Sequence, residues 1–502
     1  MSETTELAAT GTERSAQALV PADAGRVALA DAVIESLELG AAGITVHDPA
    51  TAEPIAAVPD RSVDEALEAV TRADAAGAEW AALSARQRAE VLHAWHALLV
   101  ENTEQIAHLI SREMGKTLTE ARGEVKYGAD FVRWYAEEAV RPAGGYRPTP
   151  DGGADLLTRR APVGLAVLIT PWNFPLAMAT RKIAPALAAG CPVVVKPATA
   201  TPLTTYYAVQ LARRAGVPEG LIEVITTADS AAFSQAVLAD PRVRKVSFTG
   251  STPVGRTLLE LAACNVLRSS MELGGNAPLL VFDDADLERA IEGTLAAKLR
   301  NGGQSCIGAN RIYVQSGIAE EFTAELTRRF DEVTVGAGLG AAVQLGAMIN
   351  ERAVRQMHEF TRDAVQRGAQ LRTGGHGYAG PGSFFAPTVL DTVDRDSAVA
   401  RQEIFGPIAA IQRFETEQQA LALANDTEYG LAGYVFSQDL DRALNVADRL
   451  QTGIVGINQG VPSNAAAPFG GVKHSGLGRE GGAEGLEEYQ SVRFYNIARR
   501  DT

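Results

Sequence analysis

The sequence predicts an α/β protein built from two doubly wound domains. With 502 residues the chain is longer than one hydrophobic core accommodates, so two or more domains are expected. Residues 164–263 alternate short, continuously apolar segments with helical ones, and residues 279–457 repeat the alternation. Buried apolar strands that alternate with helices are typical of parallel sheets covered by helices on both faces.

The first alternation predicts strands and helices in strict turn. Strands are expected at Leu165–Ile169, Pro192–Val195, Leu221–Ile225 and Lys245–Phe248, and helices at Ala177–Ala189, Pro202–Arg214, Ser230–Leu238 and Thr252–Ala263. The second includes strands at Leu279–Phe282, Arg311–Val314 and about Ile408–Phe414, and a helical run at Asp284–Lys298. Open sheets of this kind bind nucleotides at the carboxyl ends of their strands.

The segments outside the two alternations are of three kinds. Residues 1–40 show little periodicity, so we expect an N-terminal extension that is mobile or loosely docked. A turn and strand begin at Val46–Thr51, and apolar residues then recur at helical spacing over residues 63–140, which predicts a block of several helices. Tyr489–Tyr495 alternates polar and apolar side chains, as an edge or swapped strand does.

Composition excludes several classes of partner. A net charge of −15 and a pI of about 5.1 give no general attraction to nucleic acid or to an anionic membrane. Three cysteines form no disulfide framework, and their odd number indicates a reducing compartment. No apolar run approaches the roughly 18 residues of a membrane span. The N-terminus lacks a basic region followed by an apolar one, so a cytoplasmic location is expected.

Three polar side chains in turns rich in Gly or Pro suit covalent chemistry on a carbonyl. Cys306 closely follows a Gly-Gly pair, and a cysteine with a lowered pKa or a nearby base is a nucleophile. Glu272 ends a strand-like run before another Gly-Gly pair, where a carboxylate can activate a water. Asn173 lies between two prolines, where its amide can donate to a developing oxyanion.

Each residue also has an ordinary interpretation. An intracellular cysteine is more often structural, which we expect for Cys191 and Cys264. A lone Glu is usually a solvated surface charge, and an Asn in a turn commonly bonds to turn backbone. The motif around Cys306 favours the catalytic interpretation.

Together the three segments resemble the active site of the aldehyde dehydrogenase superfamily. They are Thr170–Pro175, Met271–Pro278 and Arg300–Cys306, and the resemblance extends from about Val46 to the C-terminus. Within the superfamily the chain is most similar to the succinate-semialdehyde dehydrogenases. The narrower match rests on Thr180-Arg181-Lys182, Lys298-Leu299-Arg300-Asn301 and Val461-Pro462-Ser463-Asn464, ahead of Pro468-Phe469-Gly470-Gly471.

The resemblance implies an aldehyde dehydrogenase-like fold with two doubly wound α/β domains and a small β oligomerisation element. The N-terminal extension would be residues 1–40, the dinucleotide-binding domain 41–145 and 164–274, the catalytic domain 275–474, and the oligomerisation element 146–163 and 475–502. The implied partners are a small-molecule aldehyde and further copies of the chain in a homodimer or homotetramer, without nucleic acid or membrane.

The implied reaction is the NAD(P)-dependent oxidation of succinate semialdehyde to succinate, without a metal. Cys306 would attack the carbonyl, Asn173 and the Cys306 N–H would stabilise the oxyanion, and Glu272 would activate the water that hydrolyses a thioester. The implied cofactor-binding residues are Thr170, Trp172, Lys196, Thr199, Gly250, Ser251, Gly255, Glu403 and Phe405. The substrate's distal carboxylate would be held by Arg181, Arg300 and Ser463.

The residues give partial support to the cofactor set. Lys196 ends a buried strand, where an open α/β sheet meets a nucleotide. Gly250–Gly255 leads from a strand into a helix whose free N–H groups can hold pyrophosphate, although its spacing is not the usual G-x-G-x-x-G. Thr199 stands where many NAD-preferring relatives have Glu, and its neutral hydroxyl suits a 2′-phosphate. We therefore expect NADP or NAD, with NADP favoured.

Three alternatives remain open. The substrate could be another ω-carboxy semialdehyde, such as glutarate semialdehyde, or a neutral aldehyde. Arg181 and Arg300 could each pair with an acidic residue, since the chain holds 61 Asp and Glu. The chain could also be a non-catalytic binding protein on the same scaffold, although an intact thiol, base and amide argue against that.

Overall fold

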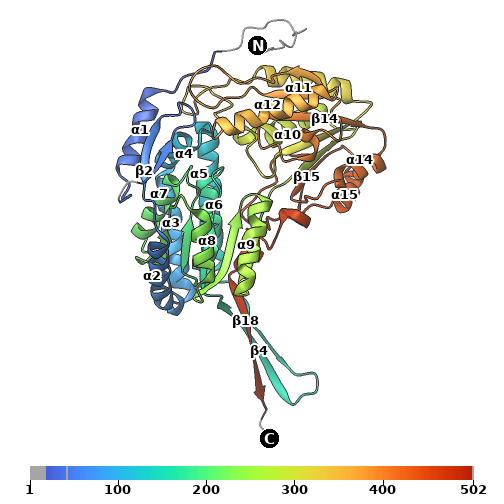
Figure 1. The fold of residues 1–502 in the computed structure, drawn as a ribbon. Coiled ribbons are helices and arrows are strands. Elements are labelled where there is room, and N and C mark those ends of the chain that lie inside the picture. Colours follow the sequence, from blue (N-terminus) through green and yellow to red (C-terminus); the bar gives the residue numbers. More distant parts are fainter. Residues whose placement is uncertain (1–17, 41–42, 500–502) are drawn as a thin grey trace.

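A computed structural model describes residues 18–40 and 43–499. Its architecture is α/β, with a six-stranded, a seven-stranded and a three-stranded sheet and a small hairpin of β1 (Ile44–His47) and β2 (Pro54–Val58) (Figure 1). The predicted fold class, two doubly wound α/β units with a small β element, is confirmed.

The six-stranded sheet carries the first alternation, in the order β17-β9-β8-β5-β6-β7. Its strands are β5 (Leu165–Ile169), β6 (Val193–Lys196), β7 (Ile222–Val224), β8 (Val243–Thr249), β9 (Arg268–Glu272) and β17 (Gly476–Leu477). Neighbouring strands are parallel except for β17, which runs antiparallel to β9. The chain adds β6 and β7 on one side of β5 and then β8 on the other. Ligands of open α/β sheets bind at the carboxyl ends beside such a reversal.

The helices of this half include the predicted helical block, which consists of four helices. They are α2 (Val63–Ala82), α3 (Ala85–Glu101), α4 (Thr103–Met114) and α5 (Leu118–Glu138), followed by α6 (Pro175–Ala189), α7 (Leu203–Arg214), α8 (Ser230–Ala239), α9 (Thr252–Cys264) and the late α16 (Gly482–Glu487). Capping boxes at Ser62, Ser84 and Thr117 begin α2, α3 and α5 by satisfying free N–H groups of the first turn.

The seven-stranded sheet carries the second alternation, in the order β12-β13-β14-β11-β10-β15-β16. Its strands are β10 (Ala277–Val281), β11 (Ala309–Gln315), β12 (Gln370–Thr373), β13 (Thr388–Asp391), β14 (Ile408–Phe414), β15 (Ala432–Phe436) and β16 (Ile454–Ile457). Its helices are α10 (Leu287–Leu299), α11 (Ala319–Asp331), α12 (Glu351–Gln366), α13 (Ala398–Arg401), α14 (Glu417–Asn425) and α15 (Leu440–Arg449). Of these strands, β12 alone runs antiparallel to its neighbour.

The two large sheets meet at a short turn. β9 ends at Glu272 and β10 begins at Ala277, so the chain passes from the carboxyl edge of one sheet to the amino edge of the other. Cys306 lies shortly before β11 and is therefore also at that amino edge. This connection brings the predicted base and the predicted nucleophile to one seam.

The three-stranded sheet projects from the body as a long arm (Figure 1). It contains β3 (Gly145–Pro148), β4 (Ala154–Pro162) and β18 (Gln490–Ala498), and β18 pairs with β4 along its whole length. The predicted C-terminal edge strand is thus confirmed. Val492, Phe494 and Ile497 are exposed on this arm. Residues 476–487, which the predicted division places in the oligomerisation element, include β17 on the six-stranded sheet and α16 beside α6.

Of the expected N-terminal extension, mobile or loosely docked, residues 24–35 form a helix that packs on the body. α1 (Ala24–Glu35) begins at an Asp23 N-cap and buries Ala30, Val33 and Ile34, with α4 as its principal neighbour. Ahead of it, Val20 bridges to Gly336. The rest of that prediction, for residues 1–17, lies outside the described residues.

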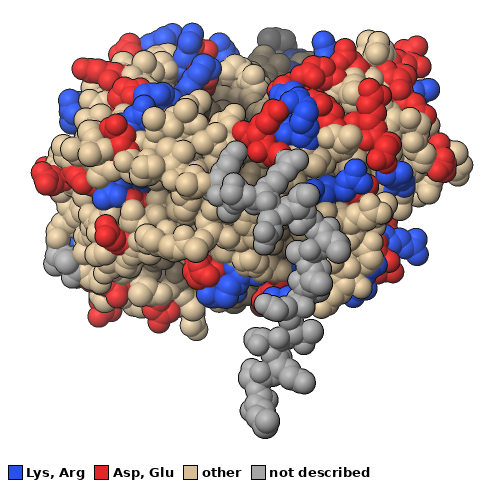
Figure 2. Space-filling view, turned by 90° about the horizontal axis from the view of Figure 1, so that it is seen from above, with Lys and Arg blue, Asp and Glu red and all other residues tan. Residues whose placement is uncertain are grey.

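Acidic and basic side chains are interspersed on the face shown in Figure 2, so this face carries no extended field of one sign. In the described part of the chain, no helix combines the length and apolar character needed to cross a membrane.

Candidate active site

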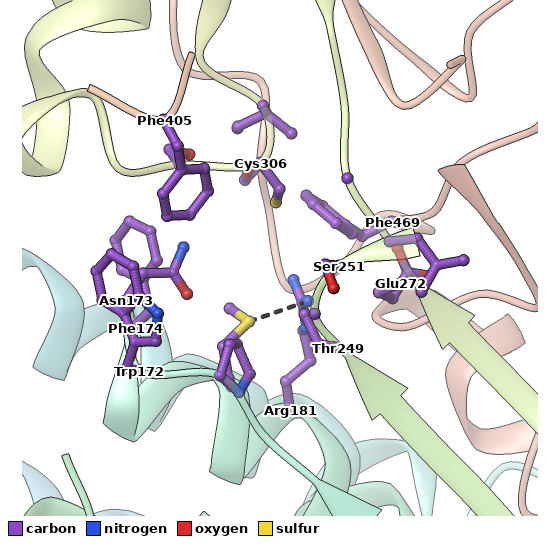
Figure 3. A pocket seen from close by; sticks show the side chains of 18 of the residues that line it. Trp172, Asn173, Phe174, Arg181, Thr249, Ser251, Glu272, Cys306, Phe405 and Phe469 are labelled. Atoms are coloured by element: carbon purple, nitrogen blue, oxygen red, sulfur yellow. Dashed lines mark hydrogen bonds between the residues drawn. The ribbon is translucent and has the colours of Figure 1, made fainter. Parts of the chain in front are cut away.

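The predicted residues converge on one cavity of about 220 Å³ at the seam between the two large sheets. Figure 3 shows Asn173, Cys306 and Glu272 around it, each from a different segment. The predicted residues that line the cavity are Trp172, Asn173, Arg181, Gly250, Ser251, Glu272, Arg300, Cys306, Glu403, Phe405 and Ser463. Thr170, Lys196, Thr199 and Gly255 do not line it.

The loop that carries Cys306 depends on left-handed backbone. Asn301, Gly302 and Gly303 have φ of +59°, +64° and +72°, a region that Gly and Asn adopt most readily. A Cβ at Gly303 would overlap the carbonyl of Gly406, so the backbone of the Cys306 loop lies directly against the backbone of Gly406. A Cβ at Gly275 would likewise overlap the Cys306 carbonyl, which shows that the turn after Glu272 touches the nucleophile loop.

Cys306 is half-buried, and its surroundings oppose ionisation. Burial raises the pKa of the thiol to about 12, and the charges of Glu403 and Glu272 act in the same direction, whereas Arg181 and Arg300 lower it. The thiol is therefore protonated at neutral pH and must lose its proton as it attacks. Cys191 is buried and forms only a weak bond to the Tyr489 carbonyl, as a structural cysteine does.

Glu272 ends β9 and is buried. Neither of its carboxylate oxygens has a hydrogen-bond partner among the described residues. Burial, assisted by the negative charge of Glu480, raises the pKa of Glu272 well above its usual range. A buried acid with both oxygens unpartnered is suited to holding a water and exchanging a proton with it.

Asn173 lies in the turn between β5 and α6. Its Nδ2 donates to the backbone oxygen of Gln304 at 3.0 Å, and its backbone oxygen accepts from Lys116 Nζ at 2.8 Å. An amide nitrogen carries two hydrogens, so one remains for a ligand in the cavity. Since Gln304 is two residues from Cys306, this bond ties the amide to the nucleophile loop.

The structure separates the two arginines of the predicted carboxylate site. Arg181 is buried and forms an ion pair with Glu480, which also pairs with Lys182. Its guanidinium lies 4.4 Å from the centre of the Phe469 ring. The alternative that the arginine pairs with an acidic residue therefore holds for Arg181, although its partner is buried.

Arg300 has no such partner. Within residues 18–40 and 43–499 it forms no ion pair or hydrogen bond, and its guanidinium lies over the Phe174 ring at 5.0 Å. Arg300 and Ser463 line both the cavity and an adjoining one of about 280 Å³, which share Tyr127 and Phe174. The two cavities thus adjoin each other, and the unpaired guanidinium of Arg300 lies in the wall that they share.

The cavity wall also contains residues that the sequence did not single out as site residues. Tyr127 and Met178 come from helices α5 and α6, and Phe469 from a distant loop. Phe469 lies in the quoted motif Pro468-Phe469-Gly470-Gly471, but neither that motif nor the sequence around Tyr127 and Met178 shows that these side chains reach the cavity, because only the tertiary fold brings the segments together. Glu480, the partner of Arg181, was missed for the same reason.

The other side of the cavity has features that fit a dinucleotide. The N-cap of α9, Ser251, forms no side-chain cap bond, which leaves N–H groups of the first turn without that partner. The buried hydroxyls of Thr170 and Thr249 have no hydrogen-bond partner among the described residues. The rings of Trp172 and Phe405 pack edge to face, with 5.4 Å between their centres. The backbone of Phe405 is left-handed, with a φ of +51°. Glu403 accepts the Gly275 N–H at 3.1 Å with one oxygen.

Lys196 and Thr199 follow at the carboxyl end of β6. Lys196 is buried, burial lowers its pKa, and it forms no side-chain bond or ion pair within the described ranges. Thr199 is half-buried in the turn beyond it. Gly255 packs against the Leu273 side chain, and a Cβ at Gly255 would overlap that side chain. These buried polar groups without partners are compatible with a nucleotide at this edge. No group of three or more potential metal ligands occurs in the part of the chain that the structure describes.

Comparison with known proteins agrees with this geometry. The model of the "Aldehyde dehydrogenase family" matches residues 38–495. A succinate-semialdehyde dehydrogenase of Paenarthrobacter nicotinovorans is 50% identical, over 88% of this chain and 99% of the relative. A 3-sulfolactaldehyde dehydrogenase of Pseudomonas putida is 48% identical, over 89% and 92%. The crystal structure of an E. coli NADP-dependent enzyme superposes with a TM-score of 0.90 at 44% identity, covering 92% of this chain and 96% of that one.

The family match covers both large sheets, most of the arm and every residue of the cavity. A thiol, an unpartnered buried carboxylate and a carboxamide converge on that cavity. The chain belongs to the aldehyde dehydrogenase family, and it is an NAD(P)-dependent aldehyde dehydrogenase.

Proposed function

We propose that this chain oxidises succinate semialdehyde to succinate, with NADP or NAD as hydride acceptor, through a thioester on Cys306. The observation that carries the substrate assignment is the unpaired Arg300 in the wall that the two cavities share. A guanidinium forks around a carboxylate with two parallel hydrogen bonds. The relative of Paenarthrobacter nicotinovorans, named for succinate semialdehyde, supports the same assignment.

In the first half-reaction the Cys306 sulfur bonds to the aldehyde carbon, and the carbonyl electron pair moves to the oxygen. Asn173 Nδ2 and the Cys306 N–H donate to that oxygen, and removing one such donor typically costs about 10²–10³-fold in rate. The thiol proton leaves to solvent as the carbon–sulfur bond forms, so Glu272 is not needed in this half-reaction. When bound, a nicotinamide dinucleotide would supply the hydride acceptor, and loss of the hydride from the carbon bonded to Cys306 would leave a thioester.

In the second half-reaction Glu272 accepts a proton from water, whose oxygen attacks the thioester carbon. The carbon–sulfur bond then breaks, which releases succinate and regenerates the thiol. The raised pKa of Glu272 makes it a stronger base than an exposed carboxylate once it is ionised. Asn173 again donates to the oxyanion.

The proposed cofactor site joins the ends of β5, β6 and β8. Ser251 and Gly250 would receive the pyrophosphate at the start of α9, and Glu403 would bond the nicotinamide ribose with the oxygen that Gly275 leaves free. Lys196 and Thr199 would hold the adenosine ribose, where the positive charge and the hydroxyl suit a 2′-phosphate. NADP is therefore the proposed preference.

The distal carboxylate of the substrate would bind Arg300 and Ser463. We assign Arg181 a smaller part in binding the distal carboxylate, because Glu480 already balances its charge. Its charge still favours the thiolate of Cys306 and an anionic substrate nearby.

The Arg300→Ala variant tests this assignment. A lost charge-assisted hydrogen bond costs roughly 1.5–3 kcal/mol, or about 10–150-fold. The kcat/KM for succinate semialdehyde should fall at least that far. The kcat/KM for butyraldehyde, which has the same chain length without the carboxylate, should change by less than about threefold. Equal losses on both aldehydes would show that Arg300 is structural.

A second substrate deserves measurement because of the Pseudomonas putida relative, which is named for 3-sulfolactaldehyde. A sulfonate carries the same charge as a carboxylate, so Arg300 could bind it. Succinate semialdehyde, glutarate semialdehyde and 3-sulfolactaldehyde should be compared by kcat/KM with both cofactors. The proposal predicts that succinate semialdehyde gives the highest value.

We also propose a homodimer or homotetramer in the cytoplasm, with the arm formed by β3, β4 and β18 as the oligomerisation element. The exposed Val492, Phe494 and Ile497 support this role, since apolar side chains on a projecting sheet gain from a partner. The six-stranded sheet would be the dinucleotide-binding domain and the seven-stranded sheet the catalytic domain. The three unpaired cysteines are consistent with a reducing compartment.

A further inference from the structure

One buried carboxamide joins the two halves of the proposed oxyanion site. Asn301 Nδ2 donates to the backbone oxygen of Asn173 at 3.0 Å and to that of Gln304 at 2.9 Å. The Gln304 oxygen also accepts from Asn173 Nδ2 at 3.0 Å. Asn301 thereby connects the turn that supplies the side-chain donor with the loop that supplies Cys306 and its N–H.

The Asn301 backbone is fixed without help from its side chain. Its N–H donates to Glu120 Oε1 at 2.6 Å, and its oxygen accepts the Gln304 N–H at 3.1 Å. The φ of +59° suits Gly as well as Asn. Removal of the side chain should therefore leave this loop conformation accessible and delete only the two cross-links.

The turn of Asn173 is held from its other side by a buried ion pair between Lys116, in the connection from α4 to α5, and Glu124 of α5. Lys116 Nζ donates to Glu124 Oε2 at 2.5 Å as well as to the Asn173 oxygen, and Glu124 Oε1 accepts the Leu176 N–H at 2.9 Å. These contacts fix the turn to the helices. Among the described residues, Asn301 supplies the side chain that bonds both this turn and the loop of Cys306.

We propose that Asn301 is a positioning residue that sets the distance and orientation between the Asn173 amide and Cys306. It acts through Asn173 and the Gln304 carbonyl and does not touch the substrate. A misplacement of about 1 Å in a catalytic constellation can cost about 10²-fold in rate. The proposal rests on the proposed function, because it needs Asn173 as the oxyanion donor.

The test uses Asn301→Gly and the burst of p-nitrophenolate from p-nitrophenyl acetate. This ester acylates a thiol through the same oxyanion and needs no hydride acceptor. The burst rate should fall about 10–100-fold, while the Kd for NADP stays within about twofold of wild type. Asn458→Gly is the matched control: Asn458 also has a left-handed φ, +54°, and its amide makes two bonds to Ser437 backbone. An equal loss of burst rate in the control would overturn the proposal.

A double-mutant cycle with Asn173→Ala separates positioning from general damage. If Asn301 acts through Asn173, the double variant should acylate no more slowly than Asn173→Ala alone. A burst rate in the double variant that falls by the product of the two single-variant losses would overturn the proposal. Should Asn301→Gly fail to fold, the near-isosteric Asn301→Asp replaces it in the same cycle with the same expectations. A wild-type protein that oxidises no aldehyde would contradict the proposed function, whereas multiplicative losses in an active enzyme contradict the positioning role alone.

Discussion

At Cys306 and Glu272, burial dominates the chemistry. It raises the thiol pKa to about 12 and the carboxyl pKa well above its usual range, so burial favours the uncharged form of both groups. Arg181 favours both ionised forms, and its own charge is balanced by Glu480. Ionisation of the nucleophile and of the base therefore depends on the balance between burial and the positive charge of Arg181.

The sequence identified the reacting residues but not their electrostatic partners. Cys306, Glu272 and Asn173 lie in recognisable local motifs, so their convergence could be expected. The sequence could not separate Arg181 from Arg300, because the partner of Arg181 lies 299 positions away in the chain. Long-range pairing of this kind leaves no local signal.

Cofactor preference should depend on Thr199. In Thr199→Glu, a carboxylate beside the 2′-phosphate repels it by roughly 1–4 kcal/mol at about 4 Å. The ratio of kcat/KM with NAD to that with NADP should rise about tenfold or more. Thr199→Gln, similar in size but neutral, should leave the ratio within about threefold. A ratio that Thr199→Glu does not change would remove this residue from the cofactor site.

Among the elements, α4 supports α7 through a single carboxyl group. Glu113 of α4 accepts the N–H groups of Leu203 at 2.8 Å and Thr204 at 2.9 Å, where α7 begins without a side-chain cap of its own. Burial raises the pKa of Glu113 to about 8. In the sequence this residue is an ordinary helical Glu, so its role as a cap for another helix could not be foreseen.

The raised pKa has a defined consequence for stability. The folded protein binds this proton more tightly than the unfolded chain, whose pKa is about 4.5. The contribution of Glu113 is thus fully present below about pH 4.5 and is lost as the pH rises through 8. Glu113→Gln should lower the free energy of unfolding by about 0.5–1.5 kcal/mol at pH 5, because Gln offers one acceptor. The difference in unfolding free energy between wild type and Glu113→Gln should shrink or change sign by pH 9.

Urea unfolding at pH 5, 7 and 9 measures this difference. Glu65→Gln is the control, because Glu65 caps α2 but has a pKa lowered to about 2, chiefly by the Ser62 N–H and the Arg61 guanidinium. The stability that ionised Glu65 contributes is present above its unfolded pKa and is lost only as the pH falls through 2. The loss of unfolding free energy in Glu65→Gln should therefore stay constant from pH 5 to 9. A deficit of Glu113→Gln that is equally constant would contradict the assigned pKa.

For the molecule as a whole, periodicity predicted the strands and helices of the two large sheets well. The predicted strands at Leu165–Ile169 and Ile408–Phe414 coincide with β5 and β14, and the other predicted elements differ from the structure at their ends. Helix α1 was missed because its composition resembles that of a flexible segment. The placement of β17 and α16 was missed because antiparallel return to a distant strand depends on tertiary contacts, here with Met271 and Glu272.

The active site is a property of this whole arrangement. The carboxyl edge of one sheet supplies Asn173, Glu272 and the cofactor turn, and the amino edge of the other supplies Cys306. Neither sheet alone contains the full set. Covalent catalysis at the seam between them is the central claim.

Mass spectrometry of the Glu272→Gln variant tests that claim most directly. The variant keeps the shape of the side chain but lacks the base for hydrolysis, which typically contributes about 10²–10⁴-fold. After mixing with succinate semialdehyde and NADP, it should form about one reduced cofactor per site and carry a succinyl group on the peptide that contains Cys306. The same experiment on Cys306→Ala should give neither. Reduced cofactor without a succinyl group on Cys306 would contradict the covalent mechanism.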